Sequence, residues 1–195
     1  AGTAPNLVYT PSNNYTGLDS FTFRAHDGLL TSSVATVSLT ISASNMVNTY
    51  ERNINCGGGP YTSLDGVFYE RDLKYSAIHG AGYVAGGQAT TEGAFGNTDD
   101  DYLFTTERYG VPEYRFDLPS GTYTVQLSFA ETYLMGGGLR KFNVYLEGVK
   151  VLDQVDVFTN AGAFGALTYT FNNVVVTDRQ LNIVFSNVVD WANIR

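Results

Sequence analysis

Residues 122–129, TYTVQLSF, alternate polar and apolar side chains without interruption. This two-residue period is typical of a β-strand with one face buried and the other exposed. The strand runs directly into residues 130–133, AETY, and then into Met135 and three glycines at 136–138. Strands that deliver aromatic side chains into flexible loops build the binding surfaces of many β-sandwiches. The sequence therefore indicates a binding module before it indicates an enzyme.

Several later stretches have the same period. Residues 141–146 and 149–152 alternate around Glu147-Gly148, which predicts a two-residue hairpin turn. Residues 167–171 and 181–185 follow the same pattern and predict a second hairpin.

The spacing of these strands predicts the fold class. No segment keeps a helical period for three turns, and eight or more short strands follow one another closely. We expect an all-β fold in which residues 50–195 form a β-sandwich of the jelly-roll type.

A shorter run of predicted strands precedes this sandwich. Residues 20–25 and 35–41 alternate around the hairpin signal Asp27-Gly28, and residues 7–10 predict a third strand. Three strands are too few to be stable as an isolated sheet. The predicted organisation is a partial β-repeat over residues 1–43, a polar linker over 44–49 and the sandwich over 50–195.

Composition restricts the partners. The net charge of −8, from 11 basic and 19 acidic residues, argues against nucleic acid or an anionic membrane surface as partner. No run of about 18 apolar residues is present, so we expect no membrane insertion. The single cysteine, Cys56, excludes an internal disulfide. An uncharged sugar or Ca²⁺ remains compatible with this charge. Because no signal peptide is present and the sequence begins abruptly at Ala1, we expect a fragment of a longer protein.

The first segment has a recognisable sequence pattern. Residues 9–23, YTPSNNYTGLDSFTF, are followed by His26-Asp27-Gly28. This run resembles the closing half of the bacterial cadherin-like or Ig-like repeats that occur in tandem on secreted and surface proteins. The resemblance implies a bacterial protein that is extracellular or on the cell surface. It also implies that the early strands of the repeat are missing, or that a neighbouring copy supplies them.

The second segment resembles the malectin-like carbohydrate-binding modules. Blocks in the family's order carry the resemblance: 55–58 (NCGG), 106–109 (TERY), 119–125 (PSGTYTV), 129–133 (FAETY), 142–144 (FNV), 155–158 (VDVF) and 189–190 (VD). Such modules are appended to secreted enzymes and surface proteins. The resemblance implies a non-catalytic sandwich that binds a glycan, with a glucose-containing oligosaccharide as the first ligand class.

The resemblance also implies a ligand site on loops at one end of the sandwich. It assigns ligand contacts to Tyr83, Tyr109, Tyr133 and Asp190, and it places Leu134 where the family has a second aromatic residue. Tyrosine suits a pyranose because its ring packs on the C–H face of the sugar and its hydroxyl forms hydrogen bonds. An aspartate accepts two sugar hydroxyls in charge-assisted hydrogen bonds.

Three charged residues beside these tyrosines allow two interpretations. Glu107 and Glu131 would be catalytic if their carboxyl groups framed a glycosidic bond. Alternatively, Arg108 pairs with an acidic neighbour, and all three residues brace the loops that hold the tyrosines. We favour the bracing role and predict no catalytic residue.

Other candidate sites are weaker. Asp99, Asp100 and Asp101 form a local carboxylate cluster that would suit Ca²⁺, but the spacing fits no EF-hand, so no cofactor is expected beyond this candidate. Trp191 follows Asp190 directly, and strand alternation predicts that it points into the core, on the face opposite Asp190. A bulge at this point would instead make Trp191 a stacking platform in place of the aromatic missing at Leu134.

Three functions remain. The favoured one is a carbohydrate-binding module, a lectin-like part of a larger secreted or surface protein. The alternative is a structural or adhesive subunit of a stalk or filament, which self-associates or contacts neighbouring domains through β-strands or loops. A glycosidase is the third, and it requires turnover that depends on Glu107 or Glu131.

Overall fold

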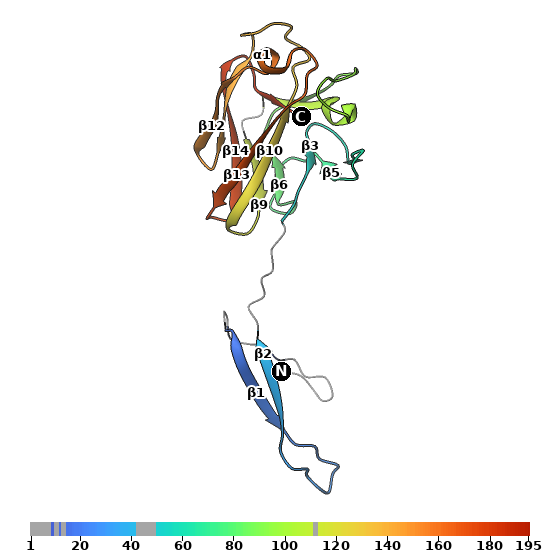
Figure 1. Cartoon of the computed structure of the whole chain (residues 1–195), viewed down its shortest axis with the longest axis vertical. Helices are drawn as coiled ribbons and strands as arrows, with labels where there is room; N and C mark the ends of the chain where they lie inside the picture. The colour runs from blue at the N-terminus through green and yellow to red at the C-terminus, as the bar shows by residue number, and fades with distance from the viewer. Residues whose placement is uncertain (1–8, 10–11, 13–14, 42–49, 111–112) are drawn as a thin grey trace. The chain divides into compact units, whose positions relative to one another are not determined.

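The computed structural model describes residues 9 and 12 and the ranges 15–41, 50–110 and 113–195 (Figure 1). The chain divides into two compact units, Ala1–Thr49 and Tyr50–Arg195. The predicted strand at 7–10 lies outside the described residues except for Tyr9, and the predicted linker at 44–49 lies outside them entirely.

Helix makes up very little of the described chain. It is confined there to the 3₁₀-helix η1 (Asp101–Phe104) and the short α-helix α1 (Val157–Ala161). The remaining regular structure is β-strand, so the predicted all-β fold is confirmed. Neither of these helices has the length and apolar character needed to cross a bilayer.

The first unit contains an antiparallel hairpin of β1 (Gly17–Phe23) and β2 (Ala35–Ile41). Beyond the strands, Asp27 Oδ1 accepts hydrogen bonds from the backbone N–H groups of Leu29 and Leu30 at 2.9 and 2.8 Å, which confirms the predicted turn. Leu29 and Leu30 are themselves 91% and 74% exposed, so the tip of the hairpin buries little apolar surface.

The second unit is a sandwich of two antiparallel sheets. One sheet has the order β12 (Val149–Val155), β11 (Lys141–Leu146), β14 (Gln180–Val189), β9 (Glu113–Asp117) and β6 (Ala81–Tyr83), and the other pairs β10 (Gly121–Phe129) with β13 (Leu167–Val176). On β10, Val125, Leu127 and Phe129 are buried, as the alternation predicts. Phe129 packs on Phe142 of β11 with ring centroids 5.6 Å apart, and this contact joins the two sheets in one apolar core.

The first predicted hairpin is confirmed. β11 pairs with β12, and the turn between them is Glu147-Gly148. Both residues have positive φ, 49° and 75°, as a two-residue turn of the primed type requires.

The second predicted hairpin is wrong. β13 pairs with β10, whereas β14 lies between β11 and β9 in the opposite sheet. The chain crosses from one sheet to the other between β13 and β14. The physical reason is that alternation specifies which face of a strand is buried, but not which strand lies beside it.

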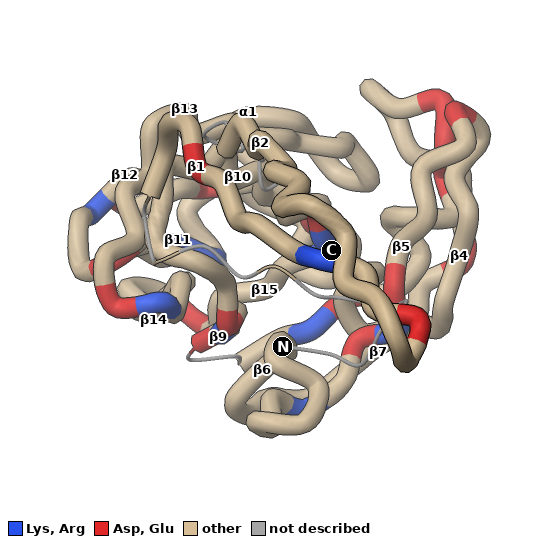
Figure 2. The backbone as a smooth tube through the Cα atoms, turned by 90° about the horizontal axis from the view of Figure 1, so that it is seen from below, with Lys and Arg blue, Asp and Glu red and all other residues tan. Residues whose placement is uncertain are grey.

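Two smaller sheets complete the second unit. Their strands are β15 (Asn193–Ile194), β8 (Thr106–Tyr109) and β7 (Gly87–Thr90) in one, and β3 (Ile54–Asn55), β5 (Phe68–Arg71) and β4 (Tyr61–Thr62) in the other. Cys56 follows β3 directly and is buried. The Lys and Arg positions of the described residues are scattered over separate elements rather than aligned along one of them (Figure 2).

Candidate functional site

The TERY block on β8 sends successive side chains to opposite faces. Thr106 donates a hydrogen bond to Asn55 Oδ1 at 3.1 Å, and Arg108 pairs with Asp72 on the same side of the strand. Glu107 and Tyr109 turn the other way, toward the residues of and around β15. Strand alternation thus gives one short block two sets of contacts.

Arg108 is held in a buried ion pair. Its Nε lies 2.9 Å from Asp72 Oδ2, and the same oxygen accepts hydrogen bonds from Tyr114 Oη at 2.9 Å and Gly57 N at 2.7 Å. Burial acts to lower the pKa of Arg108, but the charge of Asp72 outweighs it and raises that pKa. The guanidinium also lies 3.6 Å from the ring centroid of Tyr83, a cation–π distance.

Glu107 is held in a second buried pair on the other face of β8. Its Oε2 accepts hydrogen bonds from Arg195 Nη2 at 2.9 Å and Asn193 Nδ2 at 3.0 Å. Arg195 also donates to Thr132 Oγ1 at 2.6 Å and to the carbonyl oxygen of Ala130 at 3.2 Å. Burial lowers the pKa of Arg195. The pair therefore connects β8 with the residues that follow β10.

Glu131 organises the loop after β10. Its Oε2 lies 2.7 Å from Arg140 Nε, and its Oε1 accepts hydrogen bonds from the backbone N–H groups of Tyr133 and Leu134, both at 2.9 Å. Arg140 Nη1 in turn donates to the carbonyl oxygen of Trp191. One carboxylate therefore fixes the backbone that carries Tyr133 and connects it to Trp191.

These three ion pairs form what we call the charged layer. Its members are each at most 7% exposed, and they are Asp72, Glu107, Arg108, Glu131, Arg140 and Arg195. The layer leaves the carboxylates of Glu107 and Glu131 paired with arginines beneath the loops. Neither carboxylate is free on an open cleft, the position that a glycosidase acid or nucleophile requires.

Trp191 lies on the surface, and its predicted place in the core is wrong. Its side chain is 57% exposed and stacks on Tyr109 with ring centroids 6.0 Å apart and planes 10° from parallel. The alternation argument requires a continuous strand, whereas β14 ends at Val189 and Asp190 has a left-handed φ of 56°. This single residue resets the alternation and brings Trp191 out.

Tyr109 is fixed on two sides. Trp191 stacks on it, and Gly87 lies opposite it on the neighbouring strand β7. A Cβ at Gly87 would lie 2.4 Å from Tyr109 Cζ, so only glycine leaves room for the phenol ring. The ring of Tyr109 is therefore pre-oriented before any ligand arrives.

The remaining predicted ligand residues differ in exposure. Tyr133 is 78% exposed and Asp190 is exposed, whereas Leu134 is half-buried. Tyr83 is also half-buried, because it lies beneath Arg108 and packs edge-on against Tyr114 with ring centroids 6.5 Å apart. We call Tyr109, Tyr133, Asp190 and Trp191 the aromatic surface. Tyr109 and Trp191 touch directly, Tyr133 is linked to Trp191 through Glu131 and Arg140, and Tyr83 is not among these contacts.

The predicted calcium candidates do not converge. Asp100 accepts hydrogen bonds from Tyr61 Oη at 3.0 Å and Leu64 N at 2.9 Å, while Asp101 accepts one from Phe95 N at 2.8 Å. Their carboxylates thus serve separate loop segments. Within the described part of the chain, no three His, Cys, Asp or Glu side chains are placed to hold one metal ion.

Comparison with known proteins identifies a family for each of the two segments. The malectin domain family matches residues 50–193, and the bacterial Ig domain family matches residues 1–40, which confirms both resemblances. Malectin-B of Xenopus laevis is 26% identical over 56% of this chain and 40% of its own length. A probable LRR receptor-like serine/threonine-protein kinase of Arabidopsis thaliana is 32% identical over 56% of this chain and 14% of its own length.

A solved structure shares the fold. The β-glucuronidase 2 of Bacteroides uniformis superposes with a TM-score of 0.69 at 22% identity, over 88% of this chain and 21% of that chain. At this identity the similarity concerns the fold alone. This chain thus spans less than half the length of each of these three proteins.

Proposed function

The chain belongs to the malectin domain family over residues 50–193, and from this premise we propose that its second unit is a non-catalytic module that binds carbohydrate through the aromatic surface. The observation that carries the proposal is the stack of the exposed Trp191 ring on Tyr109, with the exposed Asp190 as the preceding residue in the chain. Aromatic faces pack on the C–H face of a pyranose, and a carboxylate accepts hydrogen bonds from its hydroxyls. The two kinds of contact that a sugar needs are thus supplied by consecutive residues, Asp190 and Trp191.

Trp191 supplies the second stacking ring in this proposal. The family resemblance places an aromatic after Tyr133, and this chain has Leu134 there. Trp191 is larger than the phenol ring, and its outer surface is free for a ligand because its 57% exposure remains after stacking on Tyr109. We infer a glucose-containing oligosaccharide as the first ligand class, bound mainly by Trp191, Tyr133 and Asp190. Tyr83, beneath Arg108, contributes by positioning and not by contact.

The absence of catalysis follows from the charged layer in this proposal. Glu107 and Glu131 are each buried and accept hydrogen bonds from an arginine and from further donors, so in this proposal both carboxylates serve the structure. The module would therefore hold a glycan for another part of a larger secreted or cell-surface protein. With few rings in contact, binding would gain strength from multiple copies.

A glycan array tests the proposal. The wild-type chain, Trp191→Ala and Asp190→Ala are applied together with Phe68→Ala, a matched control because Phe68 is equally exposed, at 57%, but lies on β5. We expect wild type and Phe68→Ala to bind the same glucose-containing glycans and the two site variants to lose this signal while circular dichroism stays unchanged. A blank array for wild type, or equal loss in Phe68→Ala, contradicts the proposal.

A structural or adhesive role is the second candidate, and a specific observation favours it. The hairpin of the first unit exposes Leu18, Leu29 and Leu30 by 77%, 91% and 74%. Leu18 lies on β1, and Leu29 and Leu30 lie in the connection between β1 and β2. Exposed apolar side chains on and beside a strand pair favour association with another chain. Sedimentation velocity across a concentration series tests this role. A concentration-dependent oligomer that is lost in the double variant Leu29→Ser/Leu30→Ser supports the role. A monomer at every concentration contradicts it.

A further inference from the structure

Four aliphatic side chains are exposed in the two segments that carry Tyr133 and Trp191. We call them the aliphatic strip, and they are Met135, Leu139, Val188 and Val189, each between 40% and 55% exposed. Met135 and Leu139 lie in the loop after β10, and the two valines end β14. Single exposed apolar residues are common on soluble proteins, whereas several gathered in one place mark an interaction site.

The two halves of the strip approach each other at Trp191. Lys141 pairs with Val189 across the antiparallel ladder of β11 and β14. One residue earlier, Arg140 Nη1 donates a hydrogen bond to the carbonyl oxygen of Trp191. The chain before Lys141 therefore runs alongside the chain after Val189, which places the backbone of Leu139 beside that of Trp191.

Local geometry joins the remaining members to this point. A Cβ at Gly136 would lie 3.0 Å from Leu139 Cδ1, so the Leu139 side chain lies over the residue that follows Met135. At the end of β14 the register against β11 shifts at Val188, and this bulge leaves two consecutive valines exposed. The strip thus continues directly from the aromatic surface.

The loop that carries half of the strip is fixed at both ends. Glu131 accepts hydrogen bonds from two backbone N–H groups at its start, and Asp156 accepts one from Gly138 N near its end. Between them, a Cβ at Gly137 would lie 2.7 Å from Thr159 Oγ1, so the loop lies directly on α1. The aliphatic side chains of this loop are therefore held at the surface by a fixed backbone.

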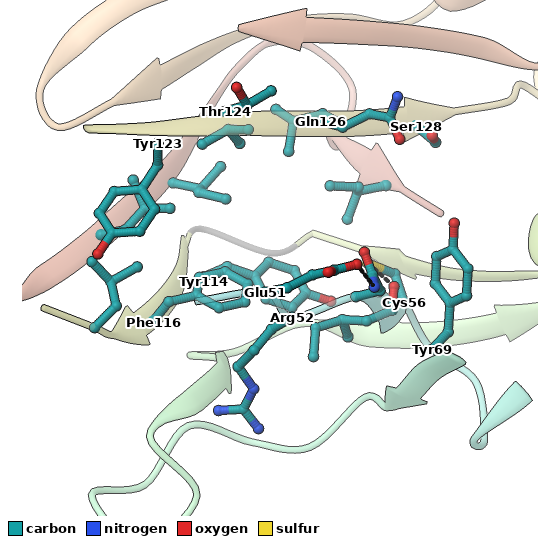
Figure 3. Close-up of a pocket in the computed structure, with 18 of the residues that line it drawn as sticks. Glu51, Arg52, Cys56, Tyr69, Tyr114, Phe116, Tyr123, Thr124, Gln126 and Ser128 are labelled. Carbon is teal, nitrogen blue, oxygen red and sulfur yellow. Dashed lines mark hydrogen bonds between the residues drawn. The ribbon is translucent and has the colours of Figure 1, made fainter. Parts of the chain in front are cut away.

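The strip is separate from the cavity between the two sheets. That cavity, of about 250 Å³, lies between β10 and the rings of Tyr114 and Phe116 (Figure 3). Tyr123 and Tyr69 lie at its two ends in this view, and its described lining includes no member of the strip. A group that covers the strip would therefore lie along the surface and not enter this cavity.

The chemistry of the strip suits an alkyl chain and not a sugar. A pyranose placed against aliphatic side chains would lose hydrogen bonds from its hydroxyls to water and gain none in return. An alkyl chain has no such cost, and its burial removes apolar surface from water on both sides of the contact. Segment 133–139, YLMGGGL, contains no charged residue that would favour a charged group.

We propose that the ligand of the aromatic surface is a neutral glycoside with an aliphatic aglycone, of the glycolipid kind, whose alkyl chain lies on the aliphatic strip. Its sugar would contact Trp191 and Asp190. The inference rests on the proposed function, because the strip continues from the rings that would hold the sugar. An alkyl chain linked to a bound sugar is held beside the strip at high effective concentration, which favours this occupant over a separate apolar molecule.

Two maltosides with the same sugar and different aglycones test the inference. Methyl β-maltoside and octyl β-maltoside, the latter below its critical micelle concentration, are titrated into the whole chain by calorimetry. We expect the Kd of octyl β-maltoside to be lower by about tenfold or more, since full burial of two methylene groups already gives a factor of this size. Octanol, which has the alkyl chain without the sugar, should not bind at the same concentrations.

Matched variants assign the gain to the strip. Met135→Ser/Leu139→Ser should reduce the ratio of the two Kd values to less than about twofold. Val149→Ser/Val175→Ser is the control, because these two exposed valines lie elsewhere, on β12 and β13, and it should keep the full ratio. Circular dichroism should be unchanged in both double variants.

Equal Kd values for the two maltosides overturn the inference and leave the carbohydrate proposal standing. Binding of neither maltoside contradicts the proposed function itself, and the inference falls with it. Binding of octanol as tight as that of octyl β-maltoside, or an equal loss of the ratio in the control variant, would assign the alkyl chain to a surface that does not depend on the sugar. A concentration-dependent dimer that Met135→Ser/Leu139→Ser abolishes in sedimentation velocity would assign the strip to a second copy of the chain.

Discussion

The charged layer and the aromatic surface reverse the usual distribution of side chains. The six residues of the charged layer are buried, whereas Tyr133 and Trp191 are 78% and 57% exposed. Burying an ion pair seldom increases stability over an apolar packing of the same volume, so stability alone does not explain the layer. Its donors and acceptors are directed at loop backbone, as with Glu131 and the N–H groups of Tyr133 and Leu134.

The difference between the two regions indicates two separate roles, loop rigidity for the charged layer and ligand contact for the aromatic surface. Fixed geometry for exposed rings requires rigid loops, and directional ion pairs provide that where a small apolar core cannot. If this division is correct, substitutions in the charged layer reduce stability, whereas substitutions in the aromatic surface reduce binding alone. The predictions below test that separation.

The largest effect is expected at Arg195. Replacing it by Met leaves the carboxylate of Glu107 buried without its ionic partner, and we expect the free energy of unfolding to fall by about 3–5 kcal/mol. Urea unfolding followed by circular dichroism measures it. The double variant Arg195→Met/Glu107→Gln is the control, since it removes the unpaired charge and should regain part of the loss. A loss below about 1 kcal/mol in the single variant would show that the pair is not structural.

A smaller effect is expected at Glu131, and it reaches both regions. Glu131→Ala removes the acceptor for two backbone N–H groups and the partner of Arg140. We expect a loss of about 2–3 kcal/mol in the free energy of unfolding and weaker glycan binding, because the Tyr133 loop is no longer fixed. Isothermal titration with the glycan selected on the array and urea unfolding measure the two effects. Unchanged binding would separate this part of the charged layer from the aromatic surface.

Trp191→Ala should have the opposite profile. We expect the Kd for the selected glycan to rise by about tenfold or more, which corresponds to about 1.4 kcal/mol. The free energy of unfolding should change by less than about 0.5 kcal/mol, because the side chain is mainly exposed. Leu134→Tyr is an informative companion, since it restores an aromatic after Tyr133. A large loss of stability in Trp191→Ala would show that the Trp191 side chain contributes to packing and not to ligand binding alone.

Asp190 tests the polar half of the aromatic surface. Asp190→Asn keeps a residue that tolerates a left-handed φ and removes the charge, so stability should be unchanged. We expect binding to weaken by about 1.5 kcal/mol, in the range for hydrogen bonds to a charged acceptor. Equal binding by the two proteins in titration calorimetry would remove Asp190 from the ligand site.

The smallest effect concerns pH and Asp156, which holds the far end of the Tyr133 loop. Its Oδ2 accepts a hydrogen bond from Gly138 N and its Oδ1 accepts one from Thr159 N at 3.0 Å. Burial acts to raise the pKa of Asp156, but these backbone donors outweigh it and lower the pKa below its ordinary value of 3.8. The stability from Asp156 is therefore complete above the unfolded pKa and is lost as pH falls through the folded pKa.

Urea unfolding between pH 2 and pH 5 measures this dependence. Asp156→Asn should be less stable than wild type near neutrality and should show a shallower decline below pH 4, so that the two stabilities approach each other in acid. Parallel curves for the two proteins would mean that other carboxylates account for the acid sensitivity.

The sequence allowed the elements to be predicted better than their partners. Alternation in residues 122–129 and the positive φ required at Glu147-Gly148 are local properties, and both predictions are confirmed. The partner of β13 is β10, a strand distant in sequence, whereas β14 lies in the opposite sheet. Local alternation does not specify such a pairing, and for this reason the predicted hairpin of β13 with β14 is wrong.

The candidate site divides in the same way. The TERY and FAETY blocks were visible, but the partners of Arg108 and Glu107 lie 36 and 88 residues away. With 11 basic and 19 acidic residues, the sequence offers many alternative pairs. Trp191 was misplaced because one backbone torsion, at Asp190, decides its direction. Such a torsion leaves no trace in hydrophobic periodicity.

Cys56 is a native probe for local opening of the second unit. It is the single cysteine of the chain, it is 6% exposed, and burial raises the pKa of its thiol to about 12. A disulfide reagent added to the native protein therefore meets no reactive thiolate until the region around β3 opens. The labelling rate reports how often that region opens, without any introduced probe. The same labelling measurement on each variant would compare the opening rates of this region. Equilibrium unfolding gives a free energy and not such a rate.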